Sequence, residues 1–177
     1  DEGKRLFVDF DGAMAYAQIW LNGQYLGTWP YGYNSFRMEL TPHLKYGQEN
    51  VLAVRLDTEK WDSRWYPGAG IYRHVWLVRT SPVHVGHWGT YVTTPQLTDA
   101  AGTANVEVTV DNQSEATVKA TIRADIYELD DAGAKVASSP DSALEIPAGG
   151  RTTTALAATV ANPKRWDITA PNRYLLR

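Results

Sequence analysis

The stretch AYAQIWLNGQYLG at residues 15–27 decides the fold class. Before Asn22 and Gly23, every second residue is small or aliphatic, which is the pattern of a β-strand with one buried face. Asn-Gly between two such runs predicts a β-hairpin, because both residues tolerate the positive φ angles of a type I′ turn. These residues therefore predict two antiparallel strands joined by a tight turn at Asn22 and Gly23.

The same two-residue period continues along the rest of the chain. It recurs at residues 51–56, 71–79, 106–110, 118–126, 144–146 and 156–160. Turn signals separate these runs at intervals of about a dozen residues, which is typical of a β-sandwich of immunoglobulin type. No segment has the apolar spacing of an amphipathic helix, so we expect an all-β protein.

Bulk properties exclude several function classes. The chain has 177 residues, a formal net charge of -3 and no cysteine. The charge gives no reason to expect nucleic acid or an anionic membrane as a partner, and disulfides and thiol chemistry are excluded. No apolar run approaches the roughly 20 residues of a membrane-spanning helix. The composition does not decide between a cytoplasmic and an exported protein.

A change in pattern at residues 80–95 predicts a domain boundary. Pro82 and Pro95 interrupt the strands there, and proline is excluded from central strands. Five of the seven tryptophans precede this region, whereas the apolar residues after it are mainly aliphatic. We therefore expect a first domain at residues 1–83, which carries any ligand chemistry, and a second at residues 84–177.

Six phrases follow one another along the chain: IWLNG at 19–23, YGY at 31–33, NVLAVR at 50–55, RWYPGAGIYR at 64–73, WGTYVTTP at 88–95 and PNRYL at 171–175. In this order they resemble glycoside hydrolase family 2 and look most like its bacterial β-galactosidases. Each phrase alone is weak evidence, but the ordered set spans nearly the whole chain. The resemblance implies the C-terminal part of a sugar-binding jelly-roll at 1–83, followed by an immunoglobulin-like β-sandwich at 84–177.

The resemblance also implies a role without catalysis. Retaining glycosidases need two carboxylates about 5–5.5 Å apart, and the family supplies both from a catalytic barrel that this chain lacks. We expect the chain to buttress that barrel and to shape its sugar pocket. The implied partners are the barrel, a β-galactoside and, as an open alternative, a second copy in a homo-oligomer. Any sodium or magnesium would belong to the parent enzyme.

Candidate site residues lie in the phrase at 62–73 and in one nearby loop. We expect Asp62, Arg64 and Trp65 to contact substrate, with Asp62 also a candidate sodium contact. A loop cap or an ion pair with Arg64 is the alternative for Asp62. Packing against the barrel or the missing half of the sandwich is the alternative for Trp65, and an ion pair with a carboxylate across the domain junction is the favoured alternative for Arg64. The residues expected to pack between domains are Tyr66, Arg73 and Tyr33.

Other candidates are weaker. Asp57 and Glu59 could act as an acid/base pair, but solvated charges or partners of Arg55 and Lys60 are the simpler interpretation. The four histidines lack metal-ligand spacing on a common face. Two further functions remain open: a free-standing carbohydrate-binding module and a purely structural β module. If half a sandwich is missing, a sheet face and strand edges are exposed, and the chain alone should be poorly soluble.

Overall fold

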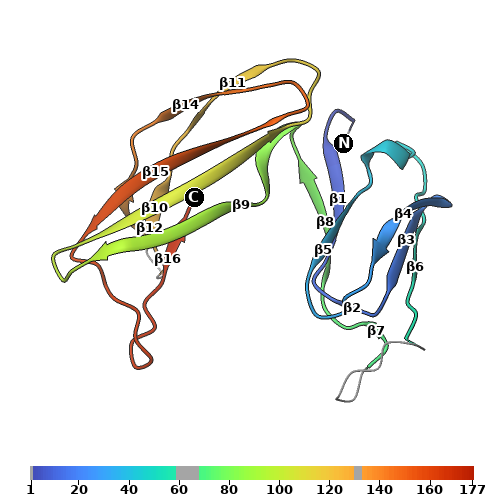
Figure 1. Cartoon of the computed structure of the whole chain (residues 1–177), viewed down its shortest axis with the longest axis horizontal. Coiled ribbons are helices and arrows are strands. Elements are labelled where there is room, and N and C mark those ends of the chain that lie inside the picture. Colours follow the sequence, from blue (N-terminus) through green and yellow to red (C-terminus); the bar gives the residue numbers. More distant parts are fainter. Residues whose placement is uncertain (1, 59–67, 130–132) are drawn as a thin grey trace. The chain divides into compact units, whose positions relative to one another are not determined.

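The computed structural model describes residues 2–58, 68–129 and 133–177, which form two compact units (Figure 1). Unit 1 covers Asp1–Ser81 and unit 2 covers Pro82–Arg177. The expectation of an all-β sandwich fold is confirmed, since the described residues form strands and one short 3-10 turn. No helix in the described part of the chain is long and apolar enough to span a membrane.

Unit 1 consists of two three-stranded antiparallel sheets and one two-stranded sheet. The strand orders are β5-β1-β8, β4-β3-β6 and β2-β7. The elements are β1 (Arg5–Phe10), β2 (Ala13–Met14), β3 (Ala17–Leu21), β4 (Gln24–Trp29), β5 (Phe36–Glu39), η1 (Thr41–His43), β6 (Leu52–Arg55), β7 (Gly70–Ile71) and β8 (Val75–Thr80).

The core of unit 1 lies between the two larger sheets. It joins alternate residues of β1 and β3 to Phe36 of β5 and to Leu40. The Phe10 and Phe36 rings stack with centroids 4.9 Å apart. The predicted hairpin is confirmed: β3 pairs with β4, and Asn22 and Gly23 have φ angles of 52° and 82°. One buried face per strand explains the period of two in the sequence.

The strand expected at residues 71–79 is interrupted. Only β7 and β8 are regular, and the residues between them form no ladder. The backbone N–H of Asp11 donates to the carbonyl of His74 at 2.9 Å, and the Tyr72 hydroxyl donates to the carbonyl of Gly32 at 2.8 Å. These contacts to distant parts of unit 1 hold the segment away from the straight path that its alternation predicts.

Unit 2 contains three small antiparallel sheets. Their strand orders are β15-β10-β9, β11-β14 and β13-β12-β16. The strands are β9 (Val83–Leu97), β10 (Ala101–Asn112), β11 (Val118–Ile122), β12 (Asp125–Glu128), β13 (Lys135–Ser138), β14 (Ser142–Ile146), β15 (Arg151–Ala161) and β16 (Tyr174–Leu176). Figure 1 shows β9, β10 and β15 running side by side as long arrows.

The core of unit 2 follows the aliphatic stripes of its sequence. Val106, Val108 and Val110 of β10 are buried against Ile146 and Leu156. A second cluster joins residues of β12, β13, β15 and β16. The predicted stripe at 118–126 is split between two strands, since β11 belongs to one sheet and β12 to another.

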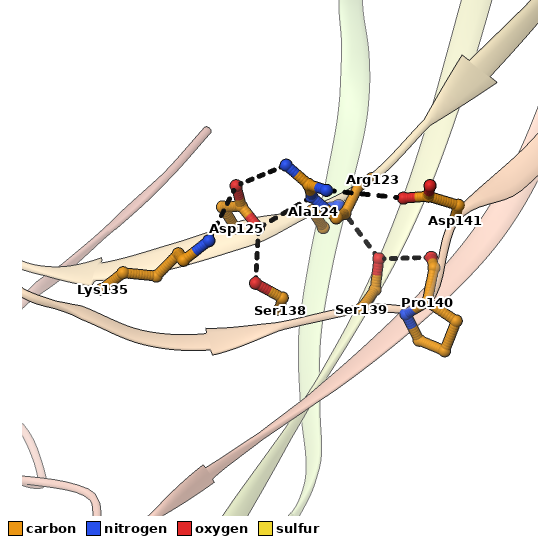
Figure 2. Close-up of polar contacts among 8 residues, drawn as sticks. All are labelled: Arg123, Ala124, Asp125, Lys135, Ser138, Ser139, Pro140 and Asp141. Atoms are coloured by element: carbon orange, nitrogen blue, oxygen red, sulfur yellow. Dashed lines mark hydrogen bonds and ion pairs between the residues drawn. The ribbon is translucent and has the colours of Figure 1, made fainter.

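A polar cluster fixes this change of sheet (Figure 2). Arg123, between β11 and β12, pairs with Asp125 at 3.1 Å and with Asp141 at 3.7 Å. The Ser138 hydroxyl on β13 donates to Asp125 at 2.6 Å. The buried hydroxyl of Ser139 accepts the backbone N–H of Ala124 at 3.0 Å, so the kink leaves this donor satisfied.

Candidate interaction surfaces

Four of the six predicted site residues lie outside the described residues. They are Asp62, Arg64, Trp65 and Tyr66. Glu59 of the weaker acid/base candidate lies outside them as well, whereas its neighbour Asp57 is 4.0 Å from the Arg55 guanidinium. The structure therefore places Arg73 and Tyr33, and the roles of the other four stay predictions.

Arg73 and Tyr33 meet in one exposed cluster of unit 1. The Arg73 guanidinium donates to the carbonyl of Tyr33 at 3.0 Å and to that of Asp11 at 3.3 Å. It also lies over the Tyr72 ring, 5.0 Å from the centroid. The rings of Tyr31 and Tyr33 meet edge to face at 5.7 Å. A cation thus joins the loop at 31–33 to the segment after β7 and holds several tyrosine rings at the surface.

Trp76, which no sequence motif singled out, extends this aromatic surface. Its indole N–H donates to the Asp11 carboxylate at 2.9 Å, and its ring lies 5.3 Å from that of His74. About half of its surface remains exposed. The signal in the sequence was the alternation of His74 and Trp76 on one strand face. It gave no indication that Asp11 would be their neighbour.

The inner face of β8 carries Val75, Leu77 and Arg79, and its two apolar residues are uncovered. Leu77 pairs with Val8, and Val75 pairs with Phe10, so each shares the core side of the sheet with its partner. Val8 is 3% exposed, whereas Leu77 is 69% exposed. Within the described residues, β8 is an edge strand with no neighbour on its far side. Core-facing residues are exposed here because nothing in the described chain packs over them.

The other large sheet of unit 1 ends in the same way. Leu52 on the edge strand β6 pairs with Leu21, which is buried in the core, yet Leu52 is exposed. We call the exposed residues Leu52 on β6 and Val75 and Leu77 on β8 together the open face of unit 1. Exposed apolar residues on the core side of a sheet mark a place where a further segment can pack. The open face is therefore a candidate contact surface for another protein segment.

Unit 2 has an apolar groove at the side where β9 and β16 lie. Its volume is about 480 Å³. Its walls include Val92, Leu97, Val160 and Leu176, all from the inner faces of sheets. Trp166, which is mostly exposed, lies at its margin. The size is that of a ligand pocket or of several aliphatic side chains.

The titratable groups of unit 2 show structural roles. A hydrogen bond from Ser138, aided by Arg123 and Lys135, lowers the pKa of Asp125. Hydrogen bonds from the backbone and hydroxyl of Thr169 lower the pKa of Asp167. A general acid needs the opposite shift. Among the described residues, no group of three or more His, Asp or Glu side chains is placed to hold a metal ion.

Comparison with family models places these surfaces in context. Residues 83–177 match the model of glycosyl hydrolases family 2, and residues 3–62 match the β-galactosidase second all-β domain. The first match alone covers more than half of the chain. This chain belongs to glycosyl hydrolase family 2. The resemblance found in the sequence is therefore confirmed.

Individual family 2 proteins resemble the chain along its whole length. The β-galactosidase BoGH2A of Bacteroides ovatus is 42% identical over 99% of the chain and 20% of its own length. A putative β-glucuronidase of Formosa agariphila is 33% identical over 97% of the chain and 16% of its own length. A solved family 2 member from Bacteroides cellulosilyticus superimposes with a TM-score of 0.92 at 33% identity, covering 99% of the chain and 24% of that structure.

The chain spans about a fifth of the length of the curated relatives it matches. Both β-galactosidases and β-glucuronidases are among them. The family is thus established by the comparisons, while the reaction and substrate of the whole protein are matters for proposal.

Proposed function

We propose that this chain is a non-catalytic portion of a retaining β-galactosidase, in which it supports the catalytic barrel and shapes part of the sugar pocket. The 42% identity to BoGH2A favours galactosides, because two glucuronidase relatives match at 29% and 33%. Four fifths of BoGH2A lies outside the matched region. There is room in such a protein for a separate catalytic domain.

The open face of unit 1 is the observation that carries the proposal. Leu52, Val75 and Leu77 share sheet faces with buried core residues but are themselves exposed. Fully burying a Leu or Val side chain stabilises a protein by about 1.5–3 kcal/mol. Covering three of them would favour a stable junction with another part of the same protein. A module that worked alone would have no need for this surface.

Within this proposal, the chain's own residues bind and position. Asp62, Arg64 and Trp65 would contact the sugar, and Asp62 would also contact a sodium ion of the parent enzyme. Tyr66, Arg73 and Tyr33 would pack against the neighbouring domain. The exposed cluster around Arg73 supports this assignment, since Tyr33 is joined to it directly. The two carboxylates of the retaining reaction would come from the barrel.

Activity measurements on two proteins test the proposal. The complete protein containing this chain and the 177-residue chain are each assayed with 4-nitrophenyl β-galactoside and 4-nitrophenyl β-glucuronide. We expect the complete protein to hydrolyse the galactoside with retention, and the chain alone to hydrolyse neither substrate. Galactoside hydrolysis by the chain alone would contradict the non-catalytic role. A preference of the complete protein for the glucuronide would contradict the assigned substrate.

Calorimetric titration separates the proposal from a free-standing carbohydrate-binding module. The chain is titrated with galactose and with lactose at millimolar concentration. The proposal predicts no measurable binding, because the chain supplies only part of the pocket. Saturable binding of either sugar would favour the independent module instead.

A further inference from the structure

The groove of unit 2 has the character of an unfinished sandwich core. Val92 on β9 pairs with Val106 on β10, so both side chains face the interior. Val106 is 1% exposed, whereas Val92 is 47% exposed. Leu97, farther along β9, is also exposed although it lines the groove. Ile126 and Leu176 form the facing wall. The groove is continuous with the buried core.

The strand β16, at the other margin of the groove, directs backbone groups away from its partner strand β12. Asp125 and Arg177 exchange both backbone hydrogen bonds, at 2.8 and 2.9 Å. Since such pairs alternate along an antiparallel ladder, Tyr174 and Leu176 point their N–H and C=O groups to the opposite side. Within the described residues, neither β16 nor β9 has a second neighbouring strand. Unpaired strand edges of this kind are templates for another strand.

Charge along β16 indicates which residues such a strand would carry. Arg173 and Arg177 flank β16 on either side. Arg177 stands on the strand face opposite to Leu176, because side chains alternate between faces, and Arg173 lies at the lining of the groove. Both arginines are exposed, and Arg177 lies over the Tyr127 ring at 5.2 Å. Opposite charges on neighbouring strands attract. A strand beside β16 would therefore present acidic side chains next to these arginines.

We propose that the groove accepts one extended β-strand, supplied by the remainder of the family 2 protein. Its alternate apolar side chains fill the groove against Val92, Leu97 and Leu176, and its acidic side chains face Arg173 and Arg177. Its backbone pairs with Tyr174 and Leu176. This inference rests on the proposed function, since it takes the strand from the rest of that protein. A small apolar ligand would fill the same volume but would leave the backbone of β16 unpaired.

Hydrogen exchange in the complete protein tests strand pairing directly. The amides of Tyr174 and Leu176 are followed by residue-resolved exchange. A paired strand in a folded domain predicts exchange slowed by about 1,000-fold or more relative to an unstructured peptide. Exchange within about tenfold of the unstructured rate, with the Arg177 amide still protected, would overturn the proposal. The latter result is also the one that a small ligand in the groove would produce.

Two variants of neighbouring residues on β9 provide a second measurement. Val92→Lys places a charge in the groove, whereas Tyr91→Lys changes the adjacent exposed residue on the opposite strand face. We expect Val92→Lys to speed exchange at Tyr174 and Leu176 by about tenfold or more, and Tyr91→Lys to leave it unchanged. Equal effects of the two variants would show that the groove does not hold the strand.

The result also separates this inference from the proposed function. If Tyr174 and Leu176 exchange freely while the complete protein is an active galactosidase and its open face of unit 1 is covered, only the strand proposal fails. If the complete protein does not hydrolyse the galactoside, the proposed function fails whatever the exchange at β16.

Discussion

Replacing Asn112 should destabilise unit 2 strongly, because this side chain is a fully buried hydrogen-bonding centre. Its exposure is 0%. Its amide group donates to the carbonyls of Ala116, Ile146 and Pro147 at 2.8, 3.0 and 3.0 Å. Its carbonyl oxygen accepts from the backbone and hydroxyl of Ser114 at 3.0 and 2.6 Å. The side chain thus fastens the end of β10 to the turns on either side of the β11–β14 sheet.

The magnitude follows from these contacts. Asn112→Ala removes the two accepted hydrogen bonds and the three donated contacts, which share two amide protons and so amount to two full bonds. At about 1 kcal/mol for each of these four bonds, the opening free energy of unit 2 should fall by about 4 kcal/mol. Asn112→Asp should cost at least as much, since a carboxylate would face three carbonyl oxygens in a buried site. Asn105→Ala, on the exposed face of the same strand, is the matched control and should change it by less than about 0.5 kcal/mol.

Native-state hydrogen exchange in urea measures the opening free energy, followed at the buried amides of Val108 and Leu156. A loss below about 1 kcal/mol for Asn112→Ala would show that the side chain does not hold unit 2 together, because that is the value of a single hydrogen bond.

The burial of Asn112 also affects the Asn-Gln-Ser sequence at 112–114. It fits an N-glycosylation signal, but in the folded chain Asn112 has no exposed surface on which a glycan could stand.

Two further predictions concern ion pairs and pH. Arg37 binds Asp9 through two hydrogen bonds of 2.6 and 2.7 Å in a mostly buried setting, so Arg37→Ala should lower the free energy of unfolding of unit 1 by about 2 kcal/mol. Arg55→Ala, which removes an exposed ion pair, is the control and should leave this free energy nearly unchanged. Urea denaturation measures both variants, and equal losses would contradict the prediction. The lowered pKa of Asp125 stabilises the folded state above the unfolded value near 4, and this stabilisation is lost as pH falls through the folded pKa. An NMR titration should show the Asp125 midpoint rising in Ser138→Ala, and an unchanged midpoint would exclude the hydrogen bond as its main cause.

Local sequence patterns predicted where the strands of this chain lie, but they did not predict which distant residues contact one another. The Asn22-Gly23 hairpin and the β10 core followed from turn chemistry and a period of two, which act over a few residues. The break after Ile71 did not, because it depends on hydrogen bonds from Asp11 and Tyr72 to residues distant in the chain. The role of Asn112 likewise depends on partners at Ile146 and Pro147, which no local pattern indicates.

For the candidate surfaces too, the sequence indicated single residues but not their long-range partners. The sequence brought Arg73 and Tyr33 to notice as packing residues, and the structure joins them through a hydrogen bond. The sequence could not identify Trp76 as part of that surface, since its Asp11 partner lies in the loop between β1 and β2, far away in the chain. The open face of unit 1 was expected only in general terms, as an exposed sheet. Which residues form it became clear from the pairing of Leu77 with Val8 and of Leu52 with Leu21.

Thiol labelling at Leu77 tests most directly whether this chain is part of a larger glycosidase that covers its open face. The chain has no cysteine, so Leu77→Cys gives it a single thiol, and Glu49→Cys at an exposed loop position is the control. Maleimide labelling of each site is compared in the 177-residue chain and in the complete protein, with the labelled peptide identified by mass spectrometry. The account predicts labelling at residue 77 slowed by about 100-fold or more in the complete protein, with residue 49 unaffected. Equal labelling rates at residue 77 in the two proteins would contradict it.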